Sequence, residues 1–130
     1  MKRKIKIIIE KNSDGFFSAY PASDKLAVGT MGDTIEETRT NMVEALNSHY
    51  KYHGKNSIKE SDLNYQFDLP SFFHYYKVIN AKALGERIGM HQSLLAQYVN
   101  GQKTPSEAQI RRILGGVHQV ARELLELQIA

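Results

Sequence analysis

The change of pattern at Pro70 constrains the fold of this chain more than any other feature. Before Pro70, short stretches in which apolar and polar residues alternate, the period of a β-strand, surround one stretch with helical spacing. After Pro70, apolar residues recur only with helical spacing. The sequence therefore predicts an α+β fold in two parts, with a small mixed domain over residues 1–69 and an all-helical domain over residues 70–130.

The first part predicts a β-β-β-α-β order. Strands are expected at residues 4–9, 16–20, 26–30 and 63–69. The helix is expected to begin after Asp33 or Thr34, either of which can cap its free amides, and to end near Gly54. A small sheet with a helix on one face follows from this order.

The second part predicts a series of helices. They are expected over residues 71–78, 81–88 and 92–99, and over residues 106–128 either as one helix or as two joined at Gly115-Gly116. Thr104, Pro105 and Glu107 match a capping box, which predicts Thr104 as the N-cap of the last helix.

The first of these helices carries an aromatic cluster, Phe72, Phe73, Tyr75 and Tyr76. Such a cluster can stack on single-stranded bases, but helical spacing turns only part of it outward. A place in a core or in a dimer interface is therefore the favoured interpretation.

The strongest motif is a helix-turn-helix over residues 83–101. Gly85 leaves room where two helices cross, and Gly89, four residues later, can take the positive φ that the turn needs. Met90, Leu95 and Tyr98 then point inward, and His91 is placed to cap the second helix.

The outward residues of that second helix suit a DNA groove. Amide side chains can pair with adenine, small side chains leave the groove open, and lysines or loop residues nearby can contact phosphate. The predicted DNA-binding residues are Gln92, Ser93, Ala96 and Gln97 on base edges, with Lys82, Asn100, Lys103 and Thr104 on the backbone.

The net charge of +3 supports this placement. Residues 1–69 carry ten Lys or Arg and ten Asp or Glu, so the whole excess lies in residues 70–130. Between Lys77 and Arg112 there are six basic and two acidic residues. We interpret this local excess of positive charge as a surface that contacts the phosphates of DNA.

Several function classes are excluded or disfavoured. The chain has no cysteine, which removes disulfide scaffolds and thiol catalysis, and no apolar run long enough to span a membrane. His49 and His53 share a helix face, but no third metal ligand accompanies them, and Glu10 is a lone acid at a strand end. We therefore expect a cytoplasmic protein that is no enzyme, with no metal, no cofactor and no membrane partner.

The helical part resembles the phage-repressor-like (XRE/Cro) helix-turn-helix class over about residues 71–114, through the stretch Ile88-Gly89-Met90-His91-Gln92-Ser93. The resemblance implies that Gln92 and Ser93 read bases and that Asn100 contacts the DNA backbone.

The first part resembles the HicB antitoxin family over about residues 3–69. The resemblance rests on the hairpin stretch at residues 14–21, on Gly32-Asp33-Thr34, Glu36-Glu37 and Asn41, and on Glu44-Ala45-Leu46. It implies a truncated RNase-H-like fold without the nuclease acids, a small ribonuclease toxin of the HicA type as partner, and repression of the chain's own operon.

The expected function is thus a transcriptional repressor that binds double-stranded DNA. It is expected to form a homodimer or a higher homo-oligomer, assembled through the first domain or through the helix after Pro105. The alternative is a stand-alone interaction or oligomerisation module, or an orphan regulator without a toxin.

Overall fold

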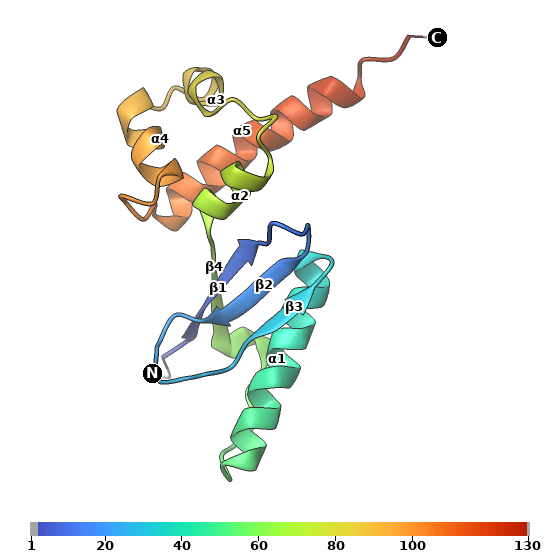
Figure 1. Cartoon of the computed structure of the whole chain (residues 1–130), viewed down its shortest axis with the longest axis vertical. Coiled ribbons are helices and arrows are strands. Elements are labelled where there is room, and N and C mark those ends of the chain that lie inside the picture. Colours follow the sequence, from blue (N-terminus) through green and yellow to red (C-terminus); the bar gives the residue numbers. More distant parts are fainter. Residues whose placement is uncertain (1–2, 130) are drawn as a thin grey trace. The chain divides into compact units, whose positions relative to one another are not determined.

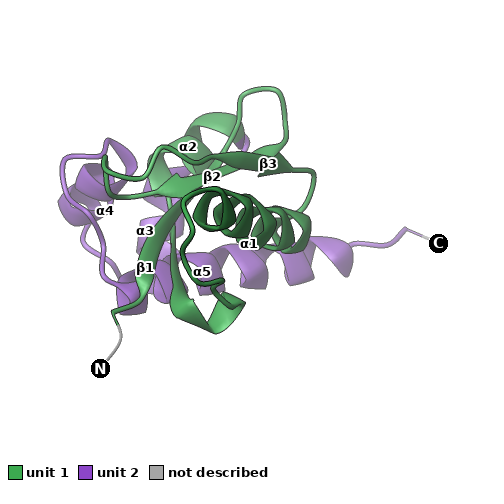
Figure 2. Cartoon of the chain, turned by 90° about the horizontal axis from the view of Figure 1, so that it is seen from below, with its two compact units in different colours: residues 1–75 green, residues 76–130 purple. Residues whose placement is uncertain are grey.

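The computed structural model describes residues 3–129 and has an α+β architecture (Figure 1). A mixed four-stranded sheet, built in β-β-β-α-β order, is followed by an all-helical region. The chain divides into two compact units, residues 1–75 and 76–130 (Figure 2). Within residues 3–129, no helix combines the length and the apolar character that crossing a membrane requires.

The sheet of the first unit has the strand order β3-β2-β1-β4. Its strands are β1 (Ile5–Lys11), β2 (Phe17–Pro21), β3 (Thr30–Gly32) and β4 (Leu63–Phe67). Strand β2 lies antiparallel to both β1 and β3, whereas β4 lies parallel to β1. A parallel pair cannot be joined by a hairpin, so the chain crosses over through a helix between β3 and β4.

That crossover helix is α1 (Ile35–Tyr52), which covers one face of the sheet (Figure 1). Thr34, one of the two residues predicted to cap this helix, is its N-cap. Its hydroxyl accepts a hydrogen bond from the Glu37 amide. Met42 and Leu46 on α1 pack with Ile7 and Ile9 of β1 in the buried core. Apolar residues on one side of β1 and at helical spacing on α1 therefore build this core.

The segment after α1 is held by one side chain. Asn47 donates to the Ile58 carbonyl and accepts from the Ile58 amide, at 3.1 and 2.7 Å. This fixes the chain before the short 3-10 helix η1 (Glu60–Asp62) that leads into β4.

The third strand was predicted in the wrong place. Strand pairing begins at Thr30, whereas residues 26–29 form no ladder with β2. Leu26 and Val28 are half-buried against the core of the first unit. Their apolar pattern therefore reflects packing of a loop and not strand pairing.

The aromatic helix α2 (Leu69–Tyr75) belongs to the first unit, so the two units meet between Tyr75 and Tyr76, six residues after the expected boundary. The Ser71 hydroxyl accepts from the Lys11 amide of β1 at 3.0 Å. The Lys11 ammonium lies over the rings of Phe17 and Tyr75, at 4.3 and 4.8 Å from their centroids. These contacts attach α2 to the sheet.

The second unit contains α3 (Ala81–Ile88), α4 (Gln92–Val99) and α5 (Glu107–Leu125). The ranges predicted for the first two of these helices are confirmed. The core of this unit is formed by Leu84, Met90, Leu95, Tyr98 and Ile113, all of them buried.

Helix α5 is one continuous helix through Gly115-Gly116. A Cβ built on Gly116 would lie 2.4 Å from Ile88 Cγ2, whereas Gly115 faces open space. Gly116 thus allows α3 and α5 to approach closely. The predicted capping box at Thr104 is wrong, because the Ser106 hydroxyl caps α5 by accepting from the Gln109 amide.

Candidate nucleic-acid interface

The turn between α3 and α4 has the predicted backbone geometry. Gly89 ends α3 with φ of 69°, in the left-handed region that favours glycine. A Cβ built on Gly85 would lie 3.1 Å from Leu95 Cδ2 and 3.4 Å from the Met90 carbonyl. The two helices therefore cross closely at Gly85, where a side chain would crowd Leu95, and Met90 is buried beneath the turn.

An arginine that the sequence analysis did not single out stabilises this turn. The Arg112 guanidinium on α5 donates to the carbonyls of Ile88 and Gly89, both at 2.9 Å. These are free carbonyls at the end of α3, where the helix dipole also favours a cation. Arg112 therefore stabilises the helix-turn-helix and is not available as a contact to DNA phosphates.

The N-terminal end of α4 presents the predicted base-reading residues to solvent. Gln92, Ser93 and Ala96 are exposed, and Gln97 is half-buried. Leu95 is buried on the opposite face of the helix and anchors α4 to the core. The sequence predicted this division correctly because the buried and exposed positions follow the helical period.

His91 and Ser93 form a local hydrogen-bonded cap at the start of α4. The His91 ring nitrogen Nδ1 accepts from the Ser93 amide at 3.3 Å and lies 2.7 Å from the Ser93 hydroxyl. The predicted N-cap role of His91 is confirmed. The cap fixes the first turn of the exposed helix end before any ligand arrives.

The loop after α4, which contains three of the residues predicted to contact the DNA backbone, forms an ordered turn. Gly101 takes φ of 76°, and the Gln97 carbonyl accepts from the amides of Gln102 and Lys103 at 2.9 and 3.2 Å. The side chains of Asn100, Lys103 and Thr104 are exposed. Seven of the eight predicted contact residues therefore lie on α4 or on the loop that follows it.

The eighth predicted residue, Lys82, is exposed in the first turn of α3. Asn80 precedes it and caps α3 by accepting from the Ala83 amide at 3.0 Å. Lys82 is thus placed to meet an anion near a helix N-terminus, where the dipole is positive.

Ion pairs within the second unit reduce the basic excess that the sequence suggested. Arg87 pairs with Glu123, and Arg111 lies 3.9 Å from Glu107. Among the residues that the structure describes, no ion pair involves Lys82 or Lys103. These two lysines are the best candidates for phosphate contacts.

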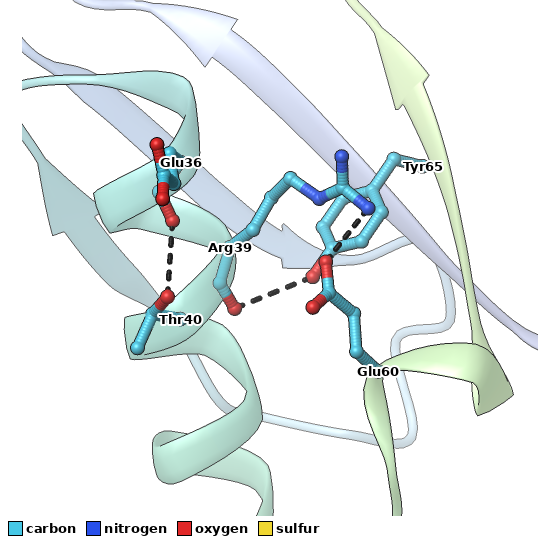
Figure 3. Close-up of polar contacts among 5 residues, drawn as sticks. All are labelled: Glu36, Arg39, Thr40, Glu60 and Tyr65. Atoms are coloured by element: carbon cyan, nitrogen blue, oxygen red, sulfur yellow. Dashed lines mark hydrogen bonds and ion pairs between the residues drawn. The ribbon is translucent and has the colours of Figure 1, made fainter.

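A second polar feature lies on the first unit, around Arg39 of α1 (Figure 3). The Arg39 guanidinium pairs with Glu60 at 2.7 Å and lies over the Tyr65 ring, 4.8 Å from its centroid. Burial and the nearby Glu60 carboxylate raise the pKa of Tyr65, against the opposing effect of Arg39. Because the charge of Arg39 is already compensated, this cluster ties α1 to η1 and β4 and offers no anion site.

The remaining candidates from the sequence are scattered. The rings of His49 and His53 lie with centroids 4.5 Å apart and planes tilted by 53°, and Glu10 accepts from the Tyr20 hydroxyl at 3.2 Å. Burial first, and then the Glu10 charge and hydrogen bond, raise the pKa of Tyr20. Within residues 3–129, no three His, Cys, Asp or Glu side chains are grouped to hold a metal ion.

The aromatic cluster divides between core and surface. Phe73 is buried, and Phe72 packs edge-on against Phe67 and Phe73. Tyr75 is 40% exposed and lies against Lys11. Phe72, Phe73 and Tyr75 are thus part of the packing of the first unit, in line with the favoured interpretation, whereas Tyr76 belongs to the second unit.

Comparisons with protein-family models, with curated proteins and with solved structures found no match to this chain.

Proposed function

We propose that this chain is a sequence-specific regulator of transcription that binds double-stranded DNA through α4. The observation that carries the proposal is the exposed N-terminal end of α4, which is held rigidly by the Gly89 turn and by the buried Leu95. Helices that enter the major groove do so by their N-terminal residues, on a scaffold of this type.

The side chains at that end have the chemistry for reading bases. Gln92 offers an amide that can pair with N6 and N7 of adenine, and the Ser93 hydroxyl can reach a base or a phosphate. Ala96 adds no bulk, so the backbone of α4 can come close to the groove floor. Lys82 and Lys103 supply charges for phosphates, which would make binding dependent on salt.

The proposed type is a HicB-like antitoxin that represses its own operon in the cytoplasm, with no catalytic step. The β-β-β-α-β order of the first unit supports this type, together with the residue pattern from Gly32 to Leu46. The first unit would then bind and block a small ribonuclease toxin of the HicA type, and the second unit would bind the operator as a homodimer.

The test of DNA binding uses the full chain and a labelled duplex from directly upstream of its gene, with a scrambled duplex as competitor. Fluorescence anisotropy should show preference for the upstream duplex. The double variant Gln92→Ala, Ser93→Ala should lose this preference, because one good base contact discriminates by about 1–3 kcal/mol. Lys103→Ala should weaken binding to all duplexes alike and reduce the salt dependence by about one phosphate.

The matched control is Gln119→Ala, which removes an exposed glutamine from α5 and should leave DNA binding unchanged. Circular dichroism should show that every variant retains its helices. A double variant that still prefers the upstream duplex would overturn the assignment of α4. A parent chain that binds both duplexes equally would overturn sequence-specific regulation.

The toxin partner is tested separately. The reading frame beside the gene is expected to encode a small basic toxin that arrests growth when it is expressed alone. Co-expression of the present chain should restore growth, and the two proteins should copurify. Growth arrest that this chain fails to relieve would leave the alternative, a regulator or interaction module without a toxin.

A further inference from the structure

The His91 side chain fixes the direction in which the Ser93 hydroxyl donates its proton. The His91 ring nitrogen Nδ1 accepts a hydrogen bond from the Ser93 amide at 3.3 Å. Because a backbone amide nitrogen is a donor, Nδ1 carries no proton and acts as the acceptor. The Ser93 hydroxyl lies 2.7 Å from the same nitrogen, and of these two groups only the hydroxyl has a proton to give. The hydroxyl therefore donates to His91.

The backbone on both sides of His91 holds this arrangement in place. The Met90 amide donates to the Gly85 carbonyl at 2.9 Å, and the His91 carbonyl accepts from the Leu95 amide at 3.1 Å. Met90 and Leu95 are buried, whereas His91 and Ser93 are exposed. The core of the second unit thus fixes the pair while leaving it accessible to a ligand.

The engaged proton limits what Ser93 can bind. A hydroxyl has one proton and two lone pairs, so Ser93 offers a ligand only its lone pairs. Phosphate oxygens are acceptors too and cannot bond to it. In the major groove, adenine and cytosine carry an amino donor, whereas guanine and thymine carry a carbonyl acceptor in its place. The four bases therefore fall into two classes for this side chain.

We infer that Ser93 reads bases with an amino group: on the DNA strand that it faces, it accepts from N6 of adenine or N4 of cytosine and rejects guanine and thymine. His91 is the positioning residue that sets this choice. The inference rests on the proposed function and narrows it, because a serine hydroxyl that turns freely serves either class of base or a phosphate. Guanine or thymine would place a carbonyl oxygen against the Ser93 lone pairs with no proton between them.

The experiment measures fluorescence anisotropy of the full chain on variants of the upstream duplex in which each base pair in turn is replaced by the other three. Ser93→Ala should lose its preference at one base pair, which identifies the pair that Ser93 reads. At that pair the parent chain should bind duplexes with adenine or cytosine on one strand about 5- to 100-fold more tightly than duplexes with guanine or thymine there.

Two substitutions of His91 separate its effect on the hydroxyl from its role as N-cap. His91→Gly removes the acceptor at a position where glycine is a tolerated N-cap, so the Ser93 hydroxyl can turn and the preference should fall to within about 2-fold. The matched control, His91→Asn, places the amide oxygen Oδ1 where Nδ1 was, and it should retain the preference. Preferences at the other base pairs should be unchanged in both variants, and circular dichroism should show that both retain their helices.

A second measurement needs no DNA. In mildly alkaline buffer, long-range ¹H–¹⁵N spectra of the parent chain should show the His91 ring proton on Nε2 and none on Nδ1. A proton on Nδ1 would overturn the inference at its first step, whether or not the chain binds DNA.

The binding results separate the inference from the proposed function. The inference alone would be overturned by a parent chain that groups adenine with guanine or thymine at the Ser93 pair, or by a Ser93→Ala variant with unchanged preferences. A His91→Gly variant that keeps the preference, or a His91→Asn variant that loses it, would do the same. A parent chain that prefers no duplex would overturn the proposed function, and the inference with it.

Discussion

Gly116 offers the sharpest test of how α5 is packed, because its neighbour Gly115 is a built-in control. An alanine at either position gains about 1 kcal/mol of helix propensity over glycine. At position 115 the new methyl group meets open space. At position 116 it would lie 2.4 Å from Ile88 Cγ2 and 3.1 Å from Leu84 Cδ1, so both side chains of α3 must move.

The cost of such overpacking is about 1–3 kcal/mol. Gly115→Ala should therefore stabilise the chain by up to about 1 kcal/mol, and Gly116→Ala should be less stable than Gly115→Ala by about 1–3 kcal/mol. Since the propensity gain is shared, the difference between the variants isolates the contact with α3.

The assay is urea unfolding followed by far-ultraviolet circular dichroism, which compares both variants with the parent chain over the same transition. Equal stability of the two variants would refute the close approach of α3 and α5. A more stable Gly116→Ala variant would do so even more directly.

Three further predictions concern single side chains. Arg112→Met should cost about 1–3 kcal/mol, because it removes two charged hydrogen bonds from the end of α3, whereas Arg111→Met should change the urea midpoint little; equal effects would contradict the capping role. Asn47→Ala should remove both hydrogen bonds to Ile58 and speed hydrogen exchange of the Ile58 amide. Unchanged protection of that amide would contradict the role of Asn47 in holding the loop. The raised pKa of Tyr20 means that the unfolded chain releases this proton first, so its contribution to stability falls as the pH rises above the ordinary value of 10.0. In an ultraviolet titration, Glu10→Gln should lower the pKa of Tyr20; an unmoved titration would contradict the role of the carboxylate.

The helix-turn-helix was predictable from the sequence because its geometry depends on local residue types. Gly89 marks the turn, and Leu95 and Tyr98 mark the inner face of α4. The α3 and α4 boundaries followed from these positions. The exposed residues at the N-terminal end of α4 could be inferred because they lie on the side of the helix opposite Leu95 and Tyr98.

Long-range contacts were not predictable in the same way. Nothing in the sequence says that Arg112 reaches the carbonyls of Ile88 and Gly89, because 24 and 23 residues separate the partners. For the same reason, α2 was expected with the helical part, although Ser71 bonds it to β1.

The N-cap of α5 shows a different kind of error, a choice between two overlapping patterns. Thr104 and Glu107 match a capping box, but so do Ser106 and Gln109, two residues later. In the structure the Ser106 hydroxyl caps the helix by accepting from the Gln109 amide, and Pro105 lies outside the helix. The correct pattern was therefore present in the sequence, and only its register was misjudged.

The central claim, that α4 and the loop after it form the DNA-binding surface, is tested most directly by nuclear magnetic resonance. The ¹⁵N-labelled full chain is titrated with the upstream duplex, and the amide shifts are mapped along the sequence. The largest shifts should fall on residues 92–97 and 100–104, with smaller ones around Lys82. Shifts confined to the first unit, or no shifts on α4, would contradict the account.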